Sequence, residues 1–577
     1  MKKTFKRLGA VLLAAFMLLS TTICALADDN TQTTPPTTGK KIMLNVSGIS
    51  VGDTVYAYKL VSYNTTGNGY EFNEGFESYI NTKKAESQTA EQYLASLKAA
   101  DVNKLLEGYA TKCNKTTGSE YKLPEASAHG TANSGNTASL ELDAGYYLLL
   151  TETTGTNSYI YTPLSAFVKA DGENLVVYAG ASNTALPKQE DESYTVSAKY
   201  TNGPTIDKRT NATKGSEDAT WRQNAVAGVG DTVRFYVKVN IPKYADGTTL
   251  NLKVNDTLTN LEYTPNSARV YSEEPKLSST GVTTDNSKII SDAIKNTDTI
   301  IAEAYNSETG TQKLTFELDH AAIMKNAAEA KSVYVYYEAI VKPEAVKNVM
   351  HDGKLEGTHE GTNVASLTYS NASTLGSAHE TDKVTTKVFN YYLKLNKVKN
   401  DTEEALKGAK FSVYTQAEGG ELLKFEQVTD TNDTKYYRPA ANGNVTQLEA
   451  NFQIRGLDAS TYYLEEVETP KGYTKPKGRF KIVMTPQSVS DEYTGKLDSD
   501  KTKTFMEAVN PDDKNLVYAG SGADSDPMHQ FSATIKNFST PNLPTTGGTG
   551  TVLLSISGVV LMAAGAYLLF FRKKKEN

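Results

Sequence analysis

Apolar and polar residues alternate in short runs along most of the chain. In residues 233–239 and 333–341, apolar side chains occupy every second position, which is the pattern of a strand with one buried face. Similar runs, separated by Gly, Asn and Asp turns, occupy residues 54–61, 146–151, 175–178, 393–398, 411–414, 462–467 and 531–535. Strands at this spacing predict a mainly β fold of immunoglobulin-like β-sandwiches in series.

One stretch has a different period. Residues 91–106 place apolar side chains at helical spacing, namely Tyr93, Leu94, Leu97, Leu105 and Leu106. We therefore expect a small helical insertion in the first domain, packed against its sheet.

The amino-terminal end carries neither pattern. Four basic residues within the first seven are followed by an apolar run over residues 8–19 and then by Ala25-Leu26-Ala27. This order is typical of a cleavable signal peptide, here residues 1–27. An uncleaved membrane anchor is the alternative, but the run is too short for a hydrocarbon layer of about 30 Å.

The carboxyl-terminal end has three parts in a fixed order. Leu543-Pro544-Thr545-Thr546-Gly547 is followed by an apolar segment, residues 552–571, and by a basic tail, residues 572–575. The apolar segment alone predicts a stop-transfer helix with its end in the cytoplasm. With LPTTG upstream, the end resembles the cell-wall sorting signal of sortase substrates. That resemblance implies attack by a sortase cysteine on the Thr546 carbonyl, release of everything from Gly547 onward, and joining of Thr546 to an amine.

The length allows three domains of ordinary size between the processed ends. We predict a signal peptide (1–27), a flexible leader (28–40), an N-terminal domain (41–187), a middle domain (188–390), a C-terminal domain (391–540) and the sorting signal (543–577).

Charge and cysteine content restrict the class of function. The 60 basic and 67 acidic residues give a net charge of −7 without long blocks, so nothing indicates binding to nucleic acid. Only Cys113 remains after signal cleavage, so the exported chain has no internal disulfide. The six histidines lack metal-binding spacing, and no phosphate-binding loop or nucleophile elbow is present. We expect no metal and no cofactor, and an enzyme is disfavoured.

Polar side chains share the strand face of the apolar core in two domains. In the C-terminal domain these inward positions are Lys397, Glu466 and Asn537. The middle domain repeats the order of lysine, carboxylate and asparagine with Lys208, Asp256 and Asn371. Edge-strand positions or ordinary buried salt bridges are the alternatives for each group.

Burial of these groups favours one reaction. Desolvation lowers the pKa of a lysine and raises that of a carboxyl, so the neutral amine and the protonated acid are both stabilised. The amine could then attack the asparagine side-chain carbonyl while the acid polarises it, leaving an isopeptide bond and ammonia. Rigid apposition in a dry core supplies effective molarities on the order of 10⁵ M or more.

The residues around these groups resemble a known family. Residues 393–537, with LKLNKV, LKGAKFSVY, GLDASTYYLEEVETPKGY and IKN, resemble the Cna-B type domains of Gram-positive pilins. Residues 204–390, with TIDK, VGDTVRFYVKVNIP, VNDTL and LTYSN, are similar to the isopeptide-forming middle domain of the same proteins. The resemblance is to sortase-assembled major pilins of the SpaA/SpaH type. It implies that Asp256 and Glu466 are catalytic and that Lys208 joins Asn371 and Lys397 joins Asn537.

The first domain departs from this pattern. Residues 145–150 resemble the strand that carries Glu466, but Leu150 stands in the place of the glutamate. We therefore expect no isopeptide bond within the first domain.

The resemblance also implies a lysine that links subunits, in a Tyr-Pro-Lys-Asn-like motif at the end of the first domain. Here Leu186-Pro187-Lys188-Gln189 occupies that place, with Leu for Tyr and Gln for Asn. We assign Lys188. The alternatives are the other nearby lysines, including Lys199 and Lys169, or a linker lysine without a role.

The sequence thus predicts the structural shaft subunit of a covalent pilus, secreted and anchored to the cell wall of a Gram-positive bacterium. Its expected partners are sortase, neighbouring copies of itself, peptidoglycan or a basal pilin, and host ligands. The alternatives are a monomeric wall-anchored adhesin that binds a host ligand and, less favoured, a wall-anchored enzyme.

Overall fold

The structure is a computed structural model of the whole chain. It describes residues 39–64, 69–97, 99–113, 121–153, 158–171, 174–179, 185–212, 219–244, 248–278, 281–346, 349–351, 354–356, 360–371, 375, 378–430, 433–498, 503–505, 518–521, 530–540 and 549–573. The predicted signal peptide, nearly all of the leader and the LPTTG residues 543–547 lie outside the described residues.

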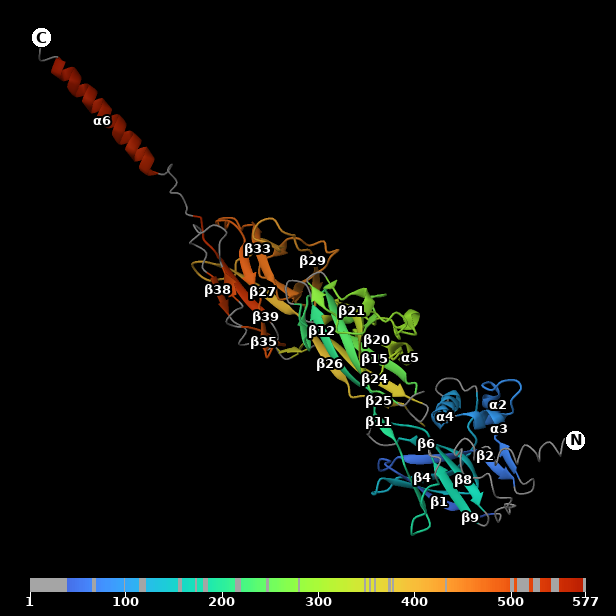
Figure 1. The fold of residues 1–577 in the computed structure, drawn as a ribbon. Helices are drawn as coiled ribbons and strands as arrows, with labels where there is room; N and C mark the ends of the chain where they lie inside the picture. The colour runs from blue at the N-terminus through green and yellow to red at the C-terminus, as the bar shows by residue number, and fades with distance from the viewer. Residues whose placement is uncertain are drawn as a thin grey trace. The chain divides into compact units, whose positions relative to one another are not determined.

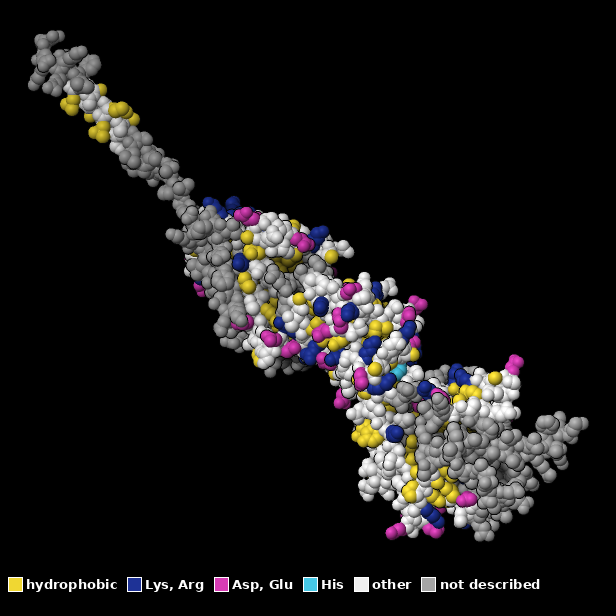
Figure 2. Space-filling view, in the orientation of Figure 1, with side chains coloured by type: hydrophobic (Ala, Val, Ile, Leu, Met, Phe, Trp, Pro, Cys, Tyr) yellow, Lys and Arg dark blue, Asp and Glu magenta, His cyan; other side chains and the backbone are white. Residues whose placement is uncertain are grey.

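The chain forms two compact units, each built mainly from strands, as predicted. The first comprises Met1–Lys347, Thr358–Phe389 and Val489–Tyr493, and the second comprises Asn348–Gly357, Asn390–Ser488 and Thr494–Asn577. On the face shown in Figure 2, basic and acidic side chains are intermingled, in keeping with the even spread of charge along the sequence.

The amino-terminal part of the first unit is a sandwich of two sheets with the strand orders β10-β1-β5 and β3-β2-β6-β8-β9, and β4 also pairs with β2 (Figure 1). The strands are β1 (Ile42–Ser47), β2 (Thr54–Asn64), β3 (Gly69–Phe72), β4 (Ala126–Thr131), β5 (Thr137–Leu142), β6 (Gly145–Glu152), β7 (Tyr159–Tyr161), β8 (Leu164–Asp171), β9 (Asn174–Ala179), β10 (Tyr194–Ser197) and β11 (Tyr200–Asn202). Because β10 pairs with β1 and β11 pairs with β7, the strands of this sandwich continue past the predicted boundary at residue 187 to Asn202.

Within residues 69–97 and 99–113, which the structure describes, the helical insertion has three helices rather than the single patch predicted over residues 91–106. They are α2 (Glu74–Asn81), α3 (Ala90–Ser96) and α4 (Ala99–Cys113). Leu97 separates the last two because its backbone is extended, with φ −78° and ψ 139°. Their apolar side chains pack with Leu148 and Leu150 of β6, so the expected packing of helix on sheet is present.

The middle part of the first unit is a second sandwich. One sheet has the order β12-β14-β21-β16 with β17 also on β21, and the other has the order β13-β26-β24-β15-β20 with β25 also on β24. The elements are β12 (Thr205–Ala212), β13 (Asn224–Val226), β14 (Thr232–Ile241), β15 (Asn251–Thr259), β16 (Leu261–Tyr263), β17 (Arg269–Tyr271), β18 (Leu277–Ser278), β19 (Gly281–Val282), the 3₁₀ turns Asn286–Lys288, Thr297–Thr299 and Pro343–Val346, β20 (Thr311–Asp319), α5 (His320–Ile323), β21 (Lys331–Val341), β24 (Glu360–Ser370), β25 (His379–Glu380) and β26 (Val384–Phe389). The predicted alternating runs 233–239 and 333–341 are the paired strands β14 and β21.

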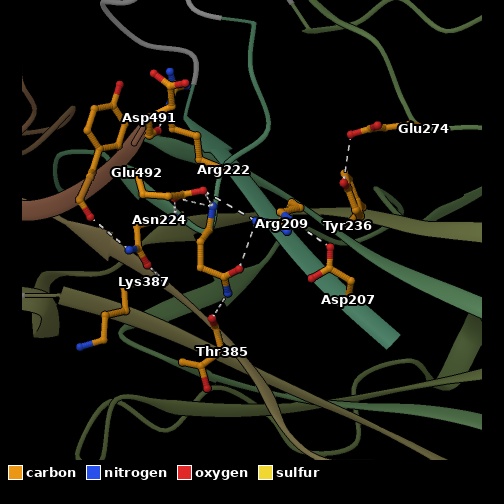
Figure 3. Close-up of polar contacts among 12 residues, drawn as sticks. Asp207, Arg209, Arg222, Asn224, Tyr236, Glu274, Thr385, Lys387, Asp491 and Glu492 are labelled. Carbon is orange, nitrogen blue, oxygen red and sulfur yellow. Dashed lines mark hydrogen bonds and ion pairs between the residues drawn. The ribbon is translucent and has the colours of Figure 1, made fainter. Parts of the chain in front are cut away.

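The segment Val489–Tyr493 belongs to the first unit although the chain on both sides of it belongs to the second. The Glu492 carboxylate accepts the backbone N–H of Gln223 at 2.7 Å and of Asn224 at 3.2 Å. Figure 3 shows Glu492 beside Asn224. Arg222 Nε donates to the Asp491 carbonyl at 2.6 Å. Backbone donors of the chain leading into β13 are thereby paired with a carboxylate.

The second unit contains a third sandwich. Its sheets have the orders β29-β30-β32-β27-β39-β38 and β31-β28-β33-β34-β37. The strands are β22 (Val349–His351), β23 (Lys354–Glu356), β27 (Tyr391–Lys399), β28 (Lys410–Tyr414), β29 (Phe425–Thr429), β30 (Lys435–Pro439), β31 (Leu448–Glu449), β32 (Gln453–Leu457), β33 (Thr461–Glu468), β34 (Phe480–Val483), β35 (Pro486–Val489), β36 (Glu492–Leu497), β37 (Lys503–Phe505), β38 (Tyr518–Ser521) and β39 (Gln530–Asn537). The first and last long strands, β27 and β39, lie side by side in parallel.

After the third sandwich the chain forms one helix, α6 (Thr549–Lys573), which includes the apolar segment 552–571. In the part of the chain that the structure describes, no helix has both the length and the apolar character needed to cross a membrane.

Candidate functional site

The polar residues predicted in the C-terminal domain meet inside the third sandwich. Lys397 on β27 and Asn537 on β39 come from neighbouring parallel strands, in which Lys397 lies opposite Ile535 and Lys399 opposite Asn537. Glu466 comes from β33 in the facing sheet. The alternation of β27, β33 and β39 turns all three side chains inward, and all three are buried.

The geometry of this cluster brings the amine to the amide. Lys397 Nζ donates to Asn537 Oδ1 at 2.6 Å, and Asn537 Nδ2 donates to Glu466 Oε1 at 2.7 Å. The distance from Lys397 Nζ to Glu466 Oε2 is 3.6 Å. The carboxyl group therefore lies next to both the attacking and the leaving nitrogen of the predicted reaction.

Burial also shifts the pKa values of Lys397 and Glu466. Desolvation lowers the pKa of Lys397 to about 8, although the nearby Glu466 acts in the opposite direction. Desolvation likewise raises the pKa of Glu466, against the attraction of Lys397. Both shifts favour the neutral amine and the protonated acid.

A second cluster lies inside the middle sandwich. Lys208 on β12 donates from Nζ to Asp256 Oδ2 on β15, at 2.6 Å, and to the hydroxyl oxygen of Tyr337 on β21, at 2.9 Å. Lys208 and Tyr337 belong to one sheet and Asp256 to the other. The Tyr337 hydroxyl donates to Asp256 Oδ2. The predicted pair of Lys208 and Asp256 is therefore assembled from the two facing sheets.

The structure does not bring the predicted acceptor Asn371 to this cluster. Asn371 is buried and faces inward. However, the residue opposite Asp256 is Ala365, which precedes Asn371 by six residues. At about 3.3 Å per residue, Asn371 is displaced by about 20 Å along the strand. The assignment of Asn371 is therefore corrected: parity selected the right face but the wrong position along it.

Asn363 occupies the place predicted for Asn371. It lies on β24 two residues from the partner of Asp256, so the two side chains are diagonal neighbours on the same face. Asn363 is completely buried and its Nδ2 donates to the Tyr337 hydroxyl oxygen at 2.6 Å. Among the described residues, Asn363 Oδ1 and Asp256 Oδ1 have no hydrogen-bond partner.

Tyr337 is the other residue that sequence reasoning missed. Its ring packs between Phe235 and Phe316, with centroid distances of 5.5 and 5.2 Å, and Lys208 Nζ lies 5.3 Å from its centroid. The available signal was a tyrosine at an inward position of residues 333–341, where the other inward side chains are aliphatic. Nothing in that strand alone indicates that its hydroxyl faces Lys208.

The electrostatics of the middle cluster parallel those of the third sandwich. Desolvation lowers the pKa of Lys208 and raises the pKa of Asp256, each opposed by the attraction of the other group. Desolvation and the neighbouring Asp256 hold the pKa of Tyr337 well above its usual value, so its hydroxyl keeps its proton.

In the first sandwich, Thr151 rather than Leu150 stands in the place of Glu466. Tyr147 donates to the carbonyl and carboxylate of Asp143, and Tyr462 makes the same two bonds to Asp458. Counting four residues onward from these tyrosines pairs Thr151 with Glu466. Leu150 instead packs with the helices. Threonine has no carboxyl group, and the absence of an isopeptide bond in this sandwich stays a prediction.

Lys188 lies in the short loop before β10. Its Nζ is 3.1 Å from Glu192 Oε1, and its side chain is 48% exposed. Lys199 is exposed, and Lys169 on β8 is half-buried. An amine that is exposed on a loop is accessible to another protein, whereas Lys208 and Lys397 are enclosed.

Two segments match known protein families. Residues 392–497 match the SpaA prealbumin-like fold domain, and residues 539–577 match the LPXTG cell wall anchor motif. The resemblance predicted for the C-terminal domain and the sorting signal is thereby confirmed, and the chain is an exported protein of the cell wall. Among curated proteins, no relative matches the chain.

The solved structures that match the chain include three pilus proteins. The T6 backbone pilin of serotype M6 Streptococcus pyogenes is 16% identical, with 79% of this chain and 84% of that chain covered and a TM-score of 0.44. The full-length RrgB pilus protein of Streptococcus pneumoniae is 13% identical, with 78% and 93% covered and a TM-score of 0.40. The full-length major pilin SpaD of Corynebacterium diphtheriae is 14% identical, with 88% and 100% covered and a TM-score of 0.38.

Proposed function

We propose that this protein is the shaft subunit of a covalent pilus, and that its middle and C-terminal sandwiches are each locked by a self-formed bond between a lysine and an asparagine. The observation that carries the proposal is the contact of Lys397 Nζ with the Asn537 amide beside Glu466, in a domain directly upstream of a sorting motif. The chain is then a substrate of sortase and catalyses only its own cross-linking.

The proposed reaction in the third sandwich begins with the neutral amine of Lys397. Its Nζ attacks Cγ of Asn537 while the protonated Glu466 hydrogen-bonds to the amide. The Cγ–Nδ2 bond then breaks, and one hydrogen that leaves Nζ departs on Nδ2 as ammonia. A half-turn of the Asn537 amide places Oδ1 next to Glu466 Oε1, which is the orientation in which the acid polarises the carbonyl.

In the middle sandwich we assign the same roles to Lys208, Asp256 and Asn363. The supporting contacts are the bond from Lys208 to Asp256 and the shared hydroxyl of Tyr337. This bond would join the two sheets, whereas the bond from Lys397 to Asn537 would join two strands of one sheet.

The test of both bonds is the intact mass of a fragment comprising residues 28–546. Each bond releases one ammonia, so the wild-type fragment should be lighter than its formula by two ammonia losses. Asp256→Ala and Glu466→Ala should each restore one loss, and the double variant should have the full formula mass. A wild-type fragment at its formula mass would disprove the cross-linking.

Polymerisation is proposed to join Thr546 of one subunit to Lys188 of the next. A head-to-tail joint of this kind does not close on itself and gives an open fibre. With the sortase that assembles the pilus, the wild-type chain should form a ladder of covalent multimers, and Lys188→Ala should remain a monomer. Lys199→Ala and Lys169→Ala are the matched controls.

The outcome of that experiment separates the two functions considered from the sequence. Multimers that persist in Lys188→Ala would move the linkage to another lysine. A wild-type chain that is anchored to the wall but never multimerises would instead indicate a monomeric adhesin.

A further inference from the structure

The proposed reaction in the middle sandwich needs a path for a proton from the lysine nitrogen to the amide nitrogen. Lys208, Asp256 and Asn363 do not provide this path by themselves. When the amine replaces the amide nitrogen, one hydrogen has to leave Nζ of Lys208 and one has to arrive on Nδ2 of Asn363. A group that touches both nitrogens is suited to this transfer. In the third sandwich the Glu466 carboxyl itself lies beside both, at 3.6 Å from Nζ and 2.7 Å from Nδ2.

The middle cluster is arranged differently. Tyr337 Oη accepts a hydrogen bond from Lys208 Nζ at 2.9 Å and from Asn363 Nδ2 at 2.6 Å, and its own hydrogen points to Asp256. The Tyr337 hydroxyl thus accepts one hydrogen bond from each of the two nitrogens and donates its hydrogen to the carboxyl group, so it contacts all three reacting groups. Asp256 contacts the amine directly, but the hydroxyl stands between it and the leaving nitrogen.

We propose that Tyr337 is a catalytic residue of the middle sandwich, whose hydroxyl passes a proton from Lys208 Nζ to Asp256 and later delivers one to Asn363 Nδ2. This inference rests on the proposed cross-link between Lys208 and Asn363. The third sandwich reaches the same product without a phenol, so the two bonds form by different proton routes.

The proton transfers balance without any further reactant. As Nζ bonds to Cγ of Asn363, the protonated Asp256 gives its proton to the amide oxygen, a hydrogen of Nζ moves to Tyr337 Oη, and the phenol hydrogen moves to Asp256 Oδ2. When the Cγ–Nδ2 bond breaks, the amide oxygen returns its proton to Asp256, Asp256 returns one from Oδ2 to Tyr337, and Tyr337 gives one to Nδ2, which leaves as ammonia. The net result is one new C–N bond, one broken C–N bond and one hydrogen moved from Nζ to Nδ2.

The site also shows why the tyrosine hydroxyl can be tested separately from the tyrosine ring. The ring packs on Phe235 and Phe316, and phenylalanine would keep these contacts. Tyr337→Phe therefore removes the oxygen that bridges the two nitrogens and leaves the aromatic packing of the core in place.

The experiment follows bond formation after synthesis of the chain in a cell-free system. Samples of wild type and Tyr337→Phe are quenched in acidic urea at intervals, digested, and analysed by mass spectrometry for the peptide pair joined through Lys208. Loss of a general acid–base group slows a reaction by about 10²- to 10⁴-fold, so the Lys208 bond should form at least about 100-fold more slowly in Tyr337→Phe. The bond between Lys397 and Asn537, measured in the same digest, should form at the wild-type rate.

The possible results separate the role of Tyr337 from the existence of the cross-link. A Tyr337→Phe chain whose Lys208 bond forms within tenfold of the wild-type rate overturns the role of Tyr337 while the proposed cross-links stand. A wild-type chain that never forms the Lys208 bond overturns the cross-link itself.

Two variants that cannot form the bond show whether Tyr337→Phe slows the reaction through a folding defect. Asp256→Ala and Asp256→Ala/Tyr337→Phe both lack the bond, so equal melting temperatures for the two show that the hydroxyl is not needed for the fold. A much lower melting temperature for the double variant would assign Tyr337 a structural role and overturn the proposal.

Discussion

At the scale of single residues, sequence and structure differ most in the asparagine that each places near Lys208 in the middle sandwich. Asn363 and Asn371 are both buried on the inner face of one chain segment. Asn363 shares a hydrogen-bond partner with Lys208, namely the Tyr337 hydroxyl.

This difference predicts opposite results for two similar substitutions. Asn363→Ala should abolish one of the two ammonia losses in the intact mass, because it removes the carbonyl that Lys208 attacks. Asn371→Ala should retain both losses. If instead Asn371→Ala alone restored the mass, the cluster described here would not be the reacting one.

The lowered pKa of Lys397 predicts that the free energy of unfolding depends on pH in a variant that cannot form the cross-link. In Asn537→Ala, Lys397 stays free, with a pKa near 8 in the folded state against 10.5 in the unfolded state. Between these values the unfolded chain binds more protons, so the free energy of unfolding should rise with pH. The slope is at most about 1.4 kcal/mol per pH unit.

Urea unfolding at a series of pH values between 7 and 10.5 measures this slope. The double variant Asn537→Ala/Lys397→Met lacks the amine and is the control for all other titrations. Parallel curves for the two variants would show that burial does not lower the pKa of Lys397.

At the scale of elements, the pairing of β27 with β39 determines which part of the chain the cross-link in the third sandwich encloses. The two strands run in parallel, and Lys397 and Asn537 are 140 residues apart in the chain. A bond between them closes almost the whole sandwich into one loop, which restricts the unfolded chain. Chain-entropy arguments give about 5 kcal/mol of stabilisation for a loop of this length.

Glu466→Gln should therefore lower the melting temperature of the third sandwich well below that of the wild type. The substitution keeps the size and burial of the side chain but removes the acid that drives bond formation. Glu465→Gln is the matched control, because Glu465 points outward to Arg479 at 3.3 Å. Equal melting of the two variants, measured by calorimetry, would contradict a stabilising cross-link.

The element scale also shows which parts of the fold were accessible from the sequence. The alternating runs became strands at the predicted places because a period of two buries one face of a sheet. The helical patch was predicted at the right place but not divided, since the extended backbone at Leu97 depends on its packing.

At the scale of the whole molecule, the two proposed bonds should differ in how much of each sandwich they shield from tension. In the third sandwich, load that enters β27 passes from Lys397 to Asn537, close to the end of β39. In the middle sandwich the bond ends at Asn363, so residues 364–389 follow it without protection. The proposed bond thus joins the first and last long strands, β27 and β39, in the third sandwich, whereas in the middle sandwich β26 follows β24 and lies beyond the bond.

Single-molecule pulling at the two ends of the folded chain should reveal this asymmetry. The third sandwich should not extend, and the middle sandwich should release at most about 90 Å, the extended length of residues 364–389. In the double variant Asp256→Ala/Glu466→Ala, both the middle and the third sandwich should unfold and extend fully. Full unfolding of either sandwich in the wild type would contradict the proposed bonds.

The sequence by itself determined the β class, the sorting motif and the inward faces of Lys208, Asp256, Lys397, Glu466 and Asn537. These follow from local order or from the period of a strand, which one chain segment carries within itself. The tertiary structure alone decided that Asn363 replaces Asn371 and that Tyr337 joins Lys208. Both depend on the register between strands and on the packing of two sheets, which bring together residues more than one hundred positions apart.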